Sequence, residues 1–113
     1  MSVTPKKAIV PAQITAAAAT YYTVPANLRS IVKKLTFTNS TAIARAVTVY
    51  LVPSGGTAGV TNILISARIV GPGETYECFE AQGHVLNTGD FIQAFADLTA
   101  TITIMGSVAE VTI

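Results

Sequence analysis

Hydrophobic and polar residues alternate along most of this chain with a period of two, the spacing at which successive side chains of a β-strand point to opposite faces. Val47, Val49 and Leu51, for example, share one parity, while Thr48 and Tyr50 share the other. Clusters of Gly, Pro, Asn and Ser separate the alternating runs and are typical of turns. The pattern predicts strands over residues 20–24, 28–39, 46–52, 62–70, 74–80, 85–86, 91–96 and 101–113.

Eight short strands and no convincing amphipathic helix predict an all-β chain, folded as a single antiparallel β-sandwich. A jelly roll has eight strands in two sheets, so we expect this architecture, with an immunoglobulin-like sandwich of seven strands as the alternative. The 113 residues match the length of one domain. We expect an extended N-terminal arm over residues 1–12, where Pro5 and Pro11 disfavour helix, and a sandwich over residues 13–113.

The longest expected internal strand contains a change of parity. Leu28 and Val32 lie at even positions, whereas Leu35 lies at an odd position. One face of a strand cannot bury both sets unless an extra residue is inserted between them. The sequence therefore predicts a β-bulge or a sharp bend at Lys33–Lys34. A second bulge is expected at Gly106, because a glycine inside a strand often marks one.

The strand over residues 91–96 leaves its orientation open. Phe91 and Phe95 share one face, and Ile92, Ala94 and Ala96 share the other. Only one set can fill the core. If the smaller set packs inside, the two phenylalanines form an outward apolar patch, which is typical of a contact with a protein partner.

Composition adds an expectation about the surface. Charged residues make up 12% of the chain, hydrophobic residues make up 50%, and the mean hydropathy is +0.54. An average soluble domain carries about 25% charged residues. We therefore expect other protein to cover part of this surface, although a solvated, Thr-rich surface is the alternative. A net charge of +1 without a basic stripe argues against nucleic acid as a partner.

Two further features of the sequence bear on where in the cell the protein is assembled. The segment from Ala8 to Leu28 carries no charge before Arg29, but Pro11 and Gln13 interrupt it, so we expect neither a membrane span nor a leader peptide. Cys78 is the single cysteine, which excludes an internal disulfide and fits assembly in a reducing cytoplasm.

Few residues could support catalysis. His84 is the single histidine, and Cys78 with His84 is the one nucleophile–base pair that could form. Cys78 lies in an alternating strand, where an inert buried thiol is expected. Glu74 and Glu80 could act as a glycosidase pair, but strand charges that discourage mispairing are commoner. One histidine and one cysteine cannot complete a zinc site. We expect no enzyme activity, no metal, no cofactor and no small-molecule substrate.

Four segments resemble a known family. They are Tyr22–Asn39 (YTVPANLRSIVKKLTFTN), Leu51–Gly56 (LVPSGG), Gly71–Thr75 (GPGET) and Leu86–Ala94 (LNTGDFIQA). In this order they resemble a small β-sandwich module of virion structural proteins in tailed bacteriophages. The resemblance covers residue 20 to the C-terminus, and its motifs are turns and strands, which specify a fold more than a role. It implies a particle protein without catalysis, present in many copies.

A module with one added arm suits a head decoration or cement protein, which binds the major capsid protein or other virion proteins. We expect a homo-oligomer, with a trimer favoured, located in the virion after assembly in the host cytoplasm. The candidate interface residues are Lys6, Lys7, Ile9, Val10, Phe91 and Phe95. A tail, neck or baseplate protein is the first alternative. A glycan- or receptor-binding module that uses Tyr21, Tyr22, Tyr50 or the loop 54–59 is the second.

Overall fold

The structure is a computed structural model that describes residues 2–113. The strands are β1 (Val3–Gln13), β2 (Ala19–Thr23), β3 (Leu28–Asn39), β4 (Arg45–Val52), β5 (Ile63–Val70), β6 (Thr75–Glu77), β7 (Val85–Leu86), β8 (Phe91–Ala96) and β9 (Ile102–Thr112). Residues 2–113 contain no helix that is long and apolar enough to cross a membrane.

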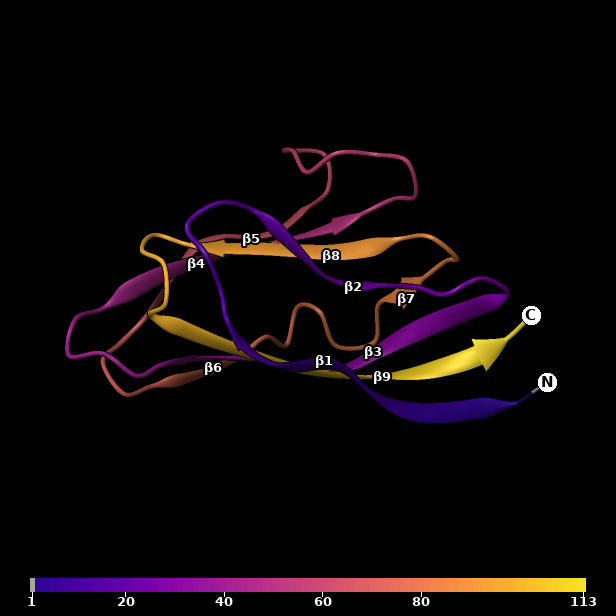
Figure 1. Ribbon diagram of the computed structural model, residues 1–113, viewed down its shortest axis with the longest axis horizontal. Helices are drawn as coiled ribbons and strands as arrows, with labels where there is room; N and C mark the ends of the chain where they lie inside the picture. Colours follow the sequence, from indigo (N-terminus) through magenta and orange to yellow (C-terminus); the bar gives the residue numbers. More distant parts are fainter. Residues whose placement is uncertain (1) are drawn as a thin grey trace.

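The strands form two antiparallel sheets that pack face to face (Figure 1). Sheet A has the order β1-β9-β3-β6, with β7 also paired to β3, and sheet B has the order β2-β8-β4-β5. β6 and β7 both pair with β3, one after the other along the same edge, so each sheet is four strands wide. Most connections between consecutive strands cross from one sheet to the other. This arrangement is a jelly roll. The expected all-β sandwich is confirmed, and the immunoglobulin-like alternative is wrong because its sheets hold four and three strands.

The core lies between the sheets and is built from the inward parity of each strand. Its largest fully buried apolar side chains are Phe37, Ile14, Leu35, Ile92, Ile102, Ile104, Val32, Val47, Val49 and Val70. Fully burying one such side chain stabilises the fold by roughly 1.5–3 kcal/mol.

The bulge predicted at Lys33–Lys34 is confirmed. Val32 pairs with Val108 and Lys34 pairs with Ser107, so β3 carries one residue more than β9 at this point. The extra residue is Lys33, which is exposed. Because of it, the buried residues on both sides of the bulge reach the same core despite their different parity.

The second bulge, predicted at Gly106, is wrong. β9 runs without interruption, and the register shifts between β1 and β9 place the extra residues in β1. Gly106 instead marks a close approach of two side chains to the β9 backbone. A Cβ atom at position 106 would lie 2.9 Å from Ile9 Cδ1 and 3.2 Å from Leu35 Cδ1.

The N-terminal segment expected as an arm is extended, but it lies along the sandwich. Residues 3–13 form β1, the edge strand of sheet A, paired with β9. In this structure the sandwich therefore includes most of residues 1–12. That these residues act as an arm toward another protein stays a prediction.

A buried polar cluster ties β1 to the core. The Tyr22 hydroxyl donates to Glu110 Oε2 at 2.7 Å and shares a hydrogen bond of 2.6 Å with Ser30 Oγ. Lys6 Nζ lies 3.5 Å from the same Glu110 oxygen. The Lys6 side chain is 47% exposed, so it stays in contact with solvent while its charged end reaches the buried carboxylate. The cluster joins four strands, from both sheets.

The pKa of Tyr22 gives this cluster a pH dependence. Burial, together with the nearby Glu110 carboxylate, raises the pKa of the phenol from 10.0 to about 12, although the Ser30 hydrogen bond opposes the shift. The unfolded chain therefore loses this proton at lower pH than the folded chain does. The resulting stabilisation is complete below pH 10 and is lost as the pH rises to about 12.

We expect the difference in urea midpoint between the wild type and Tyr22→Phe to shrink across this pH range. The variant lacks the phenol but keeps every other tyrosine and lysine, so their titrations cancel in the comparison. A difference that stays constant from below pH 10 to pH 12 would contradict the assignment.

Candidate functional site

The outer face of sheet B is the strongest candidate for a functional surface. Strand pairing places on this face Thr20, Thr23, Ala46, Thr48, Tyr50, Val52, Ile63, Ile69, Phe91, Gln93 and Phe95. None of these eleven side chains is charged. We refer to this set as the sheet B face.

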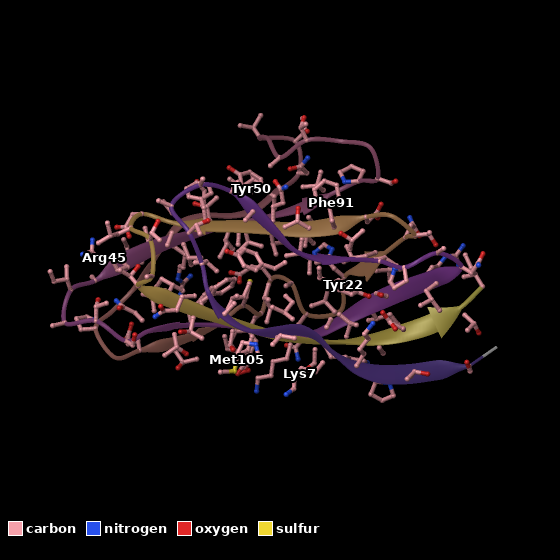
Figure 2. All side chains as sticks on the ribbon, viewed as in Figure 1. Lys7, Tyr22, Arg45, Tyr50, Phe91 and Met105 are labelled. Atoms are coloured by element: carbon pink, nitrogen blue, oxygen red, sulfur yellow. The ribbon has the colours of Figure 1, made fainter. Side chains whose placement is uncertain are left out.

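Aromatic residues occupy the middle of the sheet B face. Ile92, Ala94 and Ala96 are buried in the core, so Phe91 and Phe95 point outward and are half-buried. This settles the orientation that the sequence left open. The Phe95 ring stacks on Tyr50, with 6.2 Å between ring centroids and an interplanar angle of 27°. Figure 2 shows Tyr50 and Phe91 on the side of sheet B that faces away from sheet A.

The outer face of sheet A differs in charge. It carries Arg29 and the Lys34–Glu77 ion pair, whose charged atoms are 3.7 Å apart. Covering charged groups carries a desolvation penalty that covering Tyr, Phe and Thr avoids. The centres of protein interfaces are accordingly rich in aromatic residues and poor in charge. Of the two outer faces, the sheet B face is therefore the better suited to contact with protein.

A loop borders the sheet B face at one end. Val52 has an outward position on β4, yet it is fully buried and is not part of the core cluster. The loop 53–62 covers it, and a Cβ atom at Gly56 would lie 3.5 Å from Val52 Cγ1. Figure 1 shows this loop standing above sheet B.

The predicted interface residues of β1 do not join Phe91 and Phe95. They belong to the edge of sheet A, and Figure 2 shows Lys7 on the opposite side of the molecule from Phe91. Lys7 is exposed and Val10 is 71% exposed, whereas Ile9 is buried in the core. A partner cannot reach Ile9 while β1 is paired with β9.

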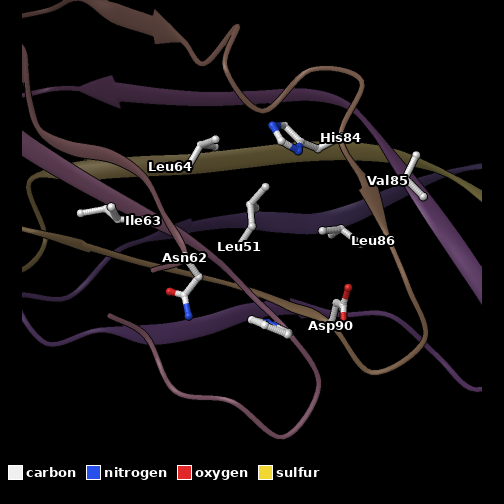
Figure 3. Close-up of a pocket in the computed structure, with 9 residues that line it drawn as sticks. Leu51, Asn62, Ile63, Leu64, His84, Val85, Leu86 and Asp90 are labelled. Atoms are coloured by element: carbon white, nitrogen blue, oxygen red, sulfur yellow. The ribbon is translucent and has the colours of Figure 1, made fainter. Parts of the chain in front are cut away.

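A hollow of about 320 Å³ lies between β7 and the end of β4 (Figure 3). It is lined by Leu51, Pro53, Asn62, Ile63, Leu64, His84, Val85, Leu86 and Asp90. Two of its polar side chains hold turns: Asp90 accepts hydrogen bonds from Ser54 N and Asn87 N, and Asn62 accepts from Gly59 N and donates to Thr57 O. The lining contains no Cys or Ser side chain that could act as a nucleophile.

The catalytic candidates do not form a site. Cys78 is buried, and burial raises the pKa of its thiol, which opposes thiolate formation. Its side-chain hydrogen bond, at 3.9 Å, goes to Glu80 and not to His84, which is exposed. The strand expected over residues 74–80 is shorter, so Glu80 lies in a turn, where Tyr76 donates to it. This bond lowers the pKa of Glu80, whereas a glycosidase acid needs a raised one.

Among residues 2–113, no three His, Cys, Asp or Glu side chains lie close enough together to hold a metal ion.

Comparisons with known proteins support the fold. No protein-family model and no curated protein sequence matches the chain. Among solved structures, a protein of Bacillus endospore appendages, described as disulfide-linked pili, is similar with a TM-score of 0.58 and 16% identity, over 99% of this chain and 89% of that one. A chain of infectious bursal disease virus, Gx strain, is similar with a TM-score of 0.54 and 17% identity.

A chain of the same virus in its T13 particle gives a TM-score of 0.54 at 15% identity. The likeness covers 96% of this chain but only 32% and 30% of the two viral chains, so this chain spans about a third of their length. At these identities the comparisons show a shared β-sandwich fold and nothing finer.

Proposed function

We propose that this chain is a non-enzymatic structural protein of a virus particle, present in many copies and bound to other protein through the sheet B face. The uncharged sheet B face, with the Tyr50–Phe95 stack at its centre, carries this proposal. The viral chains of similar fold support it, because they are parts of a particle.

Within this class, we propose a decoration protein that stabilises the head of a tailed bacteriophage by binding the major capsid protein. The sequence resemblance over residues 20–113 supports this role. A trimer would let three copies bury their uncharged faces against one another or against the capsid surface.

A subunit of a filament is the second candidate. The appendage protein is similar over 89% of its own length, so its fold is close to this one in size as well as topology. A filament subunit and a decoration protein both need a surface that binds protein. For the further alternative of a tail, neck or baseplate protein, the number of copies per particle is the test, because a head decoration protein is present in many more copies.

A glycan-binding role has less support from the side chains. Tyr22, one of its candidate residues, is buried in the polar cluster with Glu110. Tyr50 is half-buried, and its ring stacks on Phe95.

The proposal is tested by the variant Phe95→Lys. We expect the wild-type chain to form trimers in a light-scattering concentration series, and the variant to need about tenfold higher concentration or more, because truncating an interface hot spot costs about 2 kcal/mol and a buried unpaired charge adds to it. The fold should persist, since Phe95 points away from the core.

Met105→Lys is the matched control. Met105 is a large exposed apolar residue on the outer face of sheet A, and its replacement is expected to leave oligomerisation unchanged. A wild type that stays monomeric at all concentrations would contradict the trimer, and a Met105→Lys variant as impaired as Phe95→Lys would contradict the use of the sheet B face.

A further inference from the structure

β1 is an edge strand with few buried residues and an interrupted pairing. Of its eleven residues, Ile9 alone is buried. Two register shifts divide its pairing with β9 into three short stretches, at residues 3–6, at residue 9 and at residues 12–13. Pro5 and Pro11 lie within the strand and have no backbone N–H to donate. Burial and backbone hydrogen bonds therefore stabilise β1 in the sheet less than they would stabilise a regular strand of eleven residues.

The place where β1 sits is nonetheless specific. Gly106 leaves a socket on β9 that Ile9 fills, since even a single Cβ atom there would come within 2.9 Å of Ile9 Cδ1. Three positions earlier in β1, Lys6 lies 3.5 Å from the buried Glu110 carboxylate. We call this site on β9, formed by Gly106 and the Glu110 carboxylate, the β9 seat. Every copy of the chain has it.

The segment after β1 is firmly attached and marks where a released strand would stop. Ile14 is fully buried, its N–H donates to Ile102 O at 2.9 Å, and its carbonyl accepts from Ala100 N at 3.1 Å. The eleven residues before it span about 36 Å when extended. This length exceeds the two shorter dimensions of the molecule, 26 and 19 Å, so a released β1 can reach a neighbouring copy.

We propose that β1 is exchanged between copies of this chain, so that β1 of one copy occupies the β9 seat of the next. Release alone would uncover Gly106, Val108 and a free strand edge, which is a strong template for another strand. A second copy refills the seat with the same Ile9 and Lys6 contacts, so exchange preserves the contacts of the closed chain. The inference rests on the proposed function in one respect, because it requires copies to assemble.

A disulfide across the β1–β9 pair tests the exchange in the full-length chain. Val3 and Val111 are direct partners in the register, within the distance that a disulfide spans. The test variant is Val3→Cys with Val111→Cys, in a Cys78→Ala background. Oxidised after assembly, it should give covalently linked multimers on a non-reducing gel. Oxidised earlier, as a dilute monomer, it should be locked in the closed form and give no linked multimers when the copies later assemble through the sheet B face.

The matched control is Thr38→Cys with Thr75→Cys in the same background. These residues are partners on β3 and β6, with their hydroxyl oxygens 2.9 Å apart, and this pair should link only within one chain. If oligomers form but the Val3–Val111 variant also links only within one chain, exchange is wrong and the proposed function stands. If light scattering detects no oligomers at all, both the exchange and the proposed trimer are wrong.

Discussion

Asn39→Ala is expected to lower the free energy of unfolding by about 3 kcal/mol, because it removes four hydrogen bonds from a fully buried side chain. The Asn39 amide donates to Ile43 O at 2.8 Å and to Val70 O at 2.9 Å. Its carbonyl oxygen accepts from the backbone N–H of Thr41 at 2.9 Å and from the Thr41 hydroxyl at 2.7 Å. Alanine leaves two carbonyl groups without this donor and the turn after β3 without its anchor.

Urea unfolding monitored by circular dichroism measures this loss. Asn87→Ala is the control, since Asn87 is also an asparagine in a turn but is exposed, and a change within about 0.5 kcal/mol is expected there. Thr41→Val removes only the hydroxyl contacts and should cost about 1 kcal/mol. Equal effects of Asn39→Ala and Asn87→Ala would show that the buried amide is not the anchor.

Glu110→Ala is expected to cost about 2 kcal/mol, because hydrogen bonds to charged groups are the stronger ones and this carboxylate is buried. Tyr22 loses its acceptor at 2.7 Å and keeps only Ser30, and Lys6 loses its partner on β9. The Lys6 side chain is about half exposed, so its share of the loss is small. Glu110→Gln keeps an oxygen acceptor for Tyr22 and should lose less.

Glu77→Ala provides the comparison with an exposed ion pair. Glu77 lies 3.7 Å from Lys34 on the outer face of sheet A, and its removal should cost less than about 1 kcal/mol. The two glutamates are measured by the same urea unfolding experiment. A loss at position 77 as large as that at position 110 would contradict a special role for the buried cluster.

Both variants act on the stability of the fold and leave the sheet B face unchanged. Asn39 anchors the turn between β3 and β4, and Glu110 joins β1 and β2 to the centre of sheet A. Glu110 is also part of the seat that β1 occupies. A weaker seat should favour release of β1, so Glu110→Ala offers a second way to shift the exchange that the disulfide variants test.

The sequence by itself determined the class of the fold and much of its local geometry. Side chains of a strand alternate between two faces by covalent geometry, so alternation in the sequence was enough to locate every described strand except β1. The change of parity after Val32 required an extra residue, and β3 has it at Lys33. Turn residues such as Pro72 and Gly73 bounded the strands, because proline fixes φ and Gly73 takes a positive φ of 71° that few other residues accept.

The candidate site could be predicted only in part. Alternation identified Phe91 and Phe95 as one set, but it did not say which set faces the core, because both faces of β8 are apolar. Tyr50 became their neighbour only through the pairing of β4 with β8, which brings Thr48 opposite Phe95. The absence of charge on the sheet B face likewise depends on which strands are adjacent.

Tertiary structure alone decided which polar residues are buried and where the N-terminal segment lies. Glu110 and Tyr22 are 88 positions apart, and Glu110 resembles any surface glutamate until β2 and β9 meet. Residues 3–13 read as an arm because two prolines and two lysines weaken the strand pattern, yet β9 supplies a partner edge and Gly106 supplies a socket for Ile9. The physical reason is that alternation is a property of neighbours along the chain, whereas burial is a property of neighbours in space.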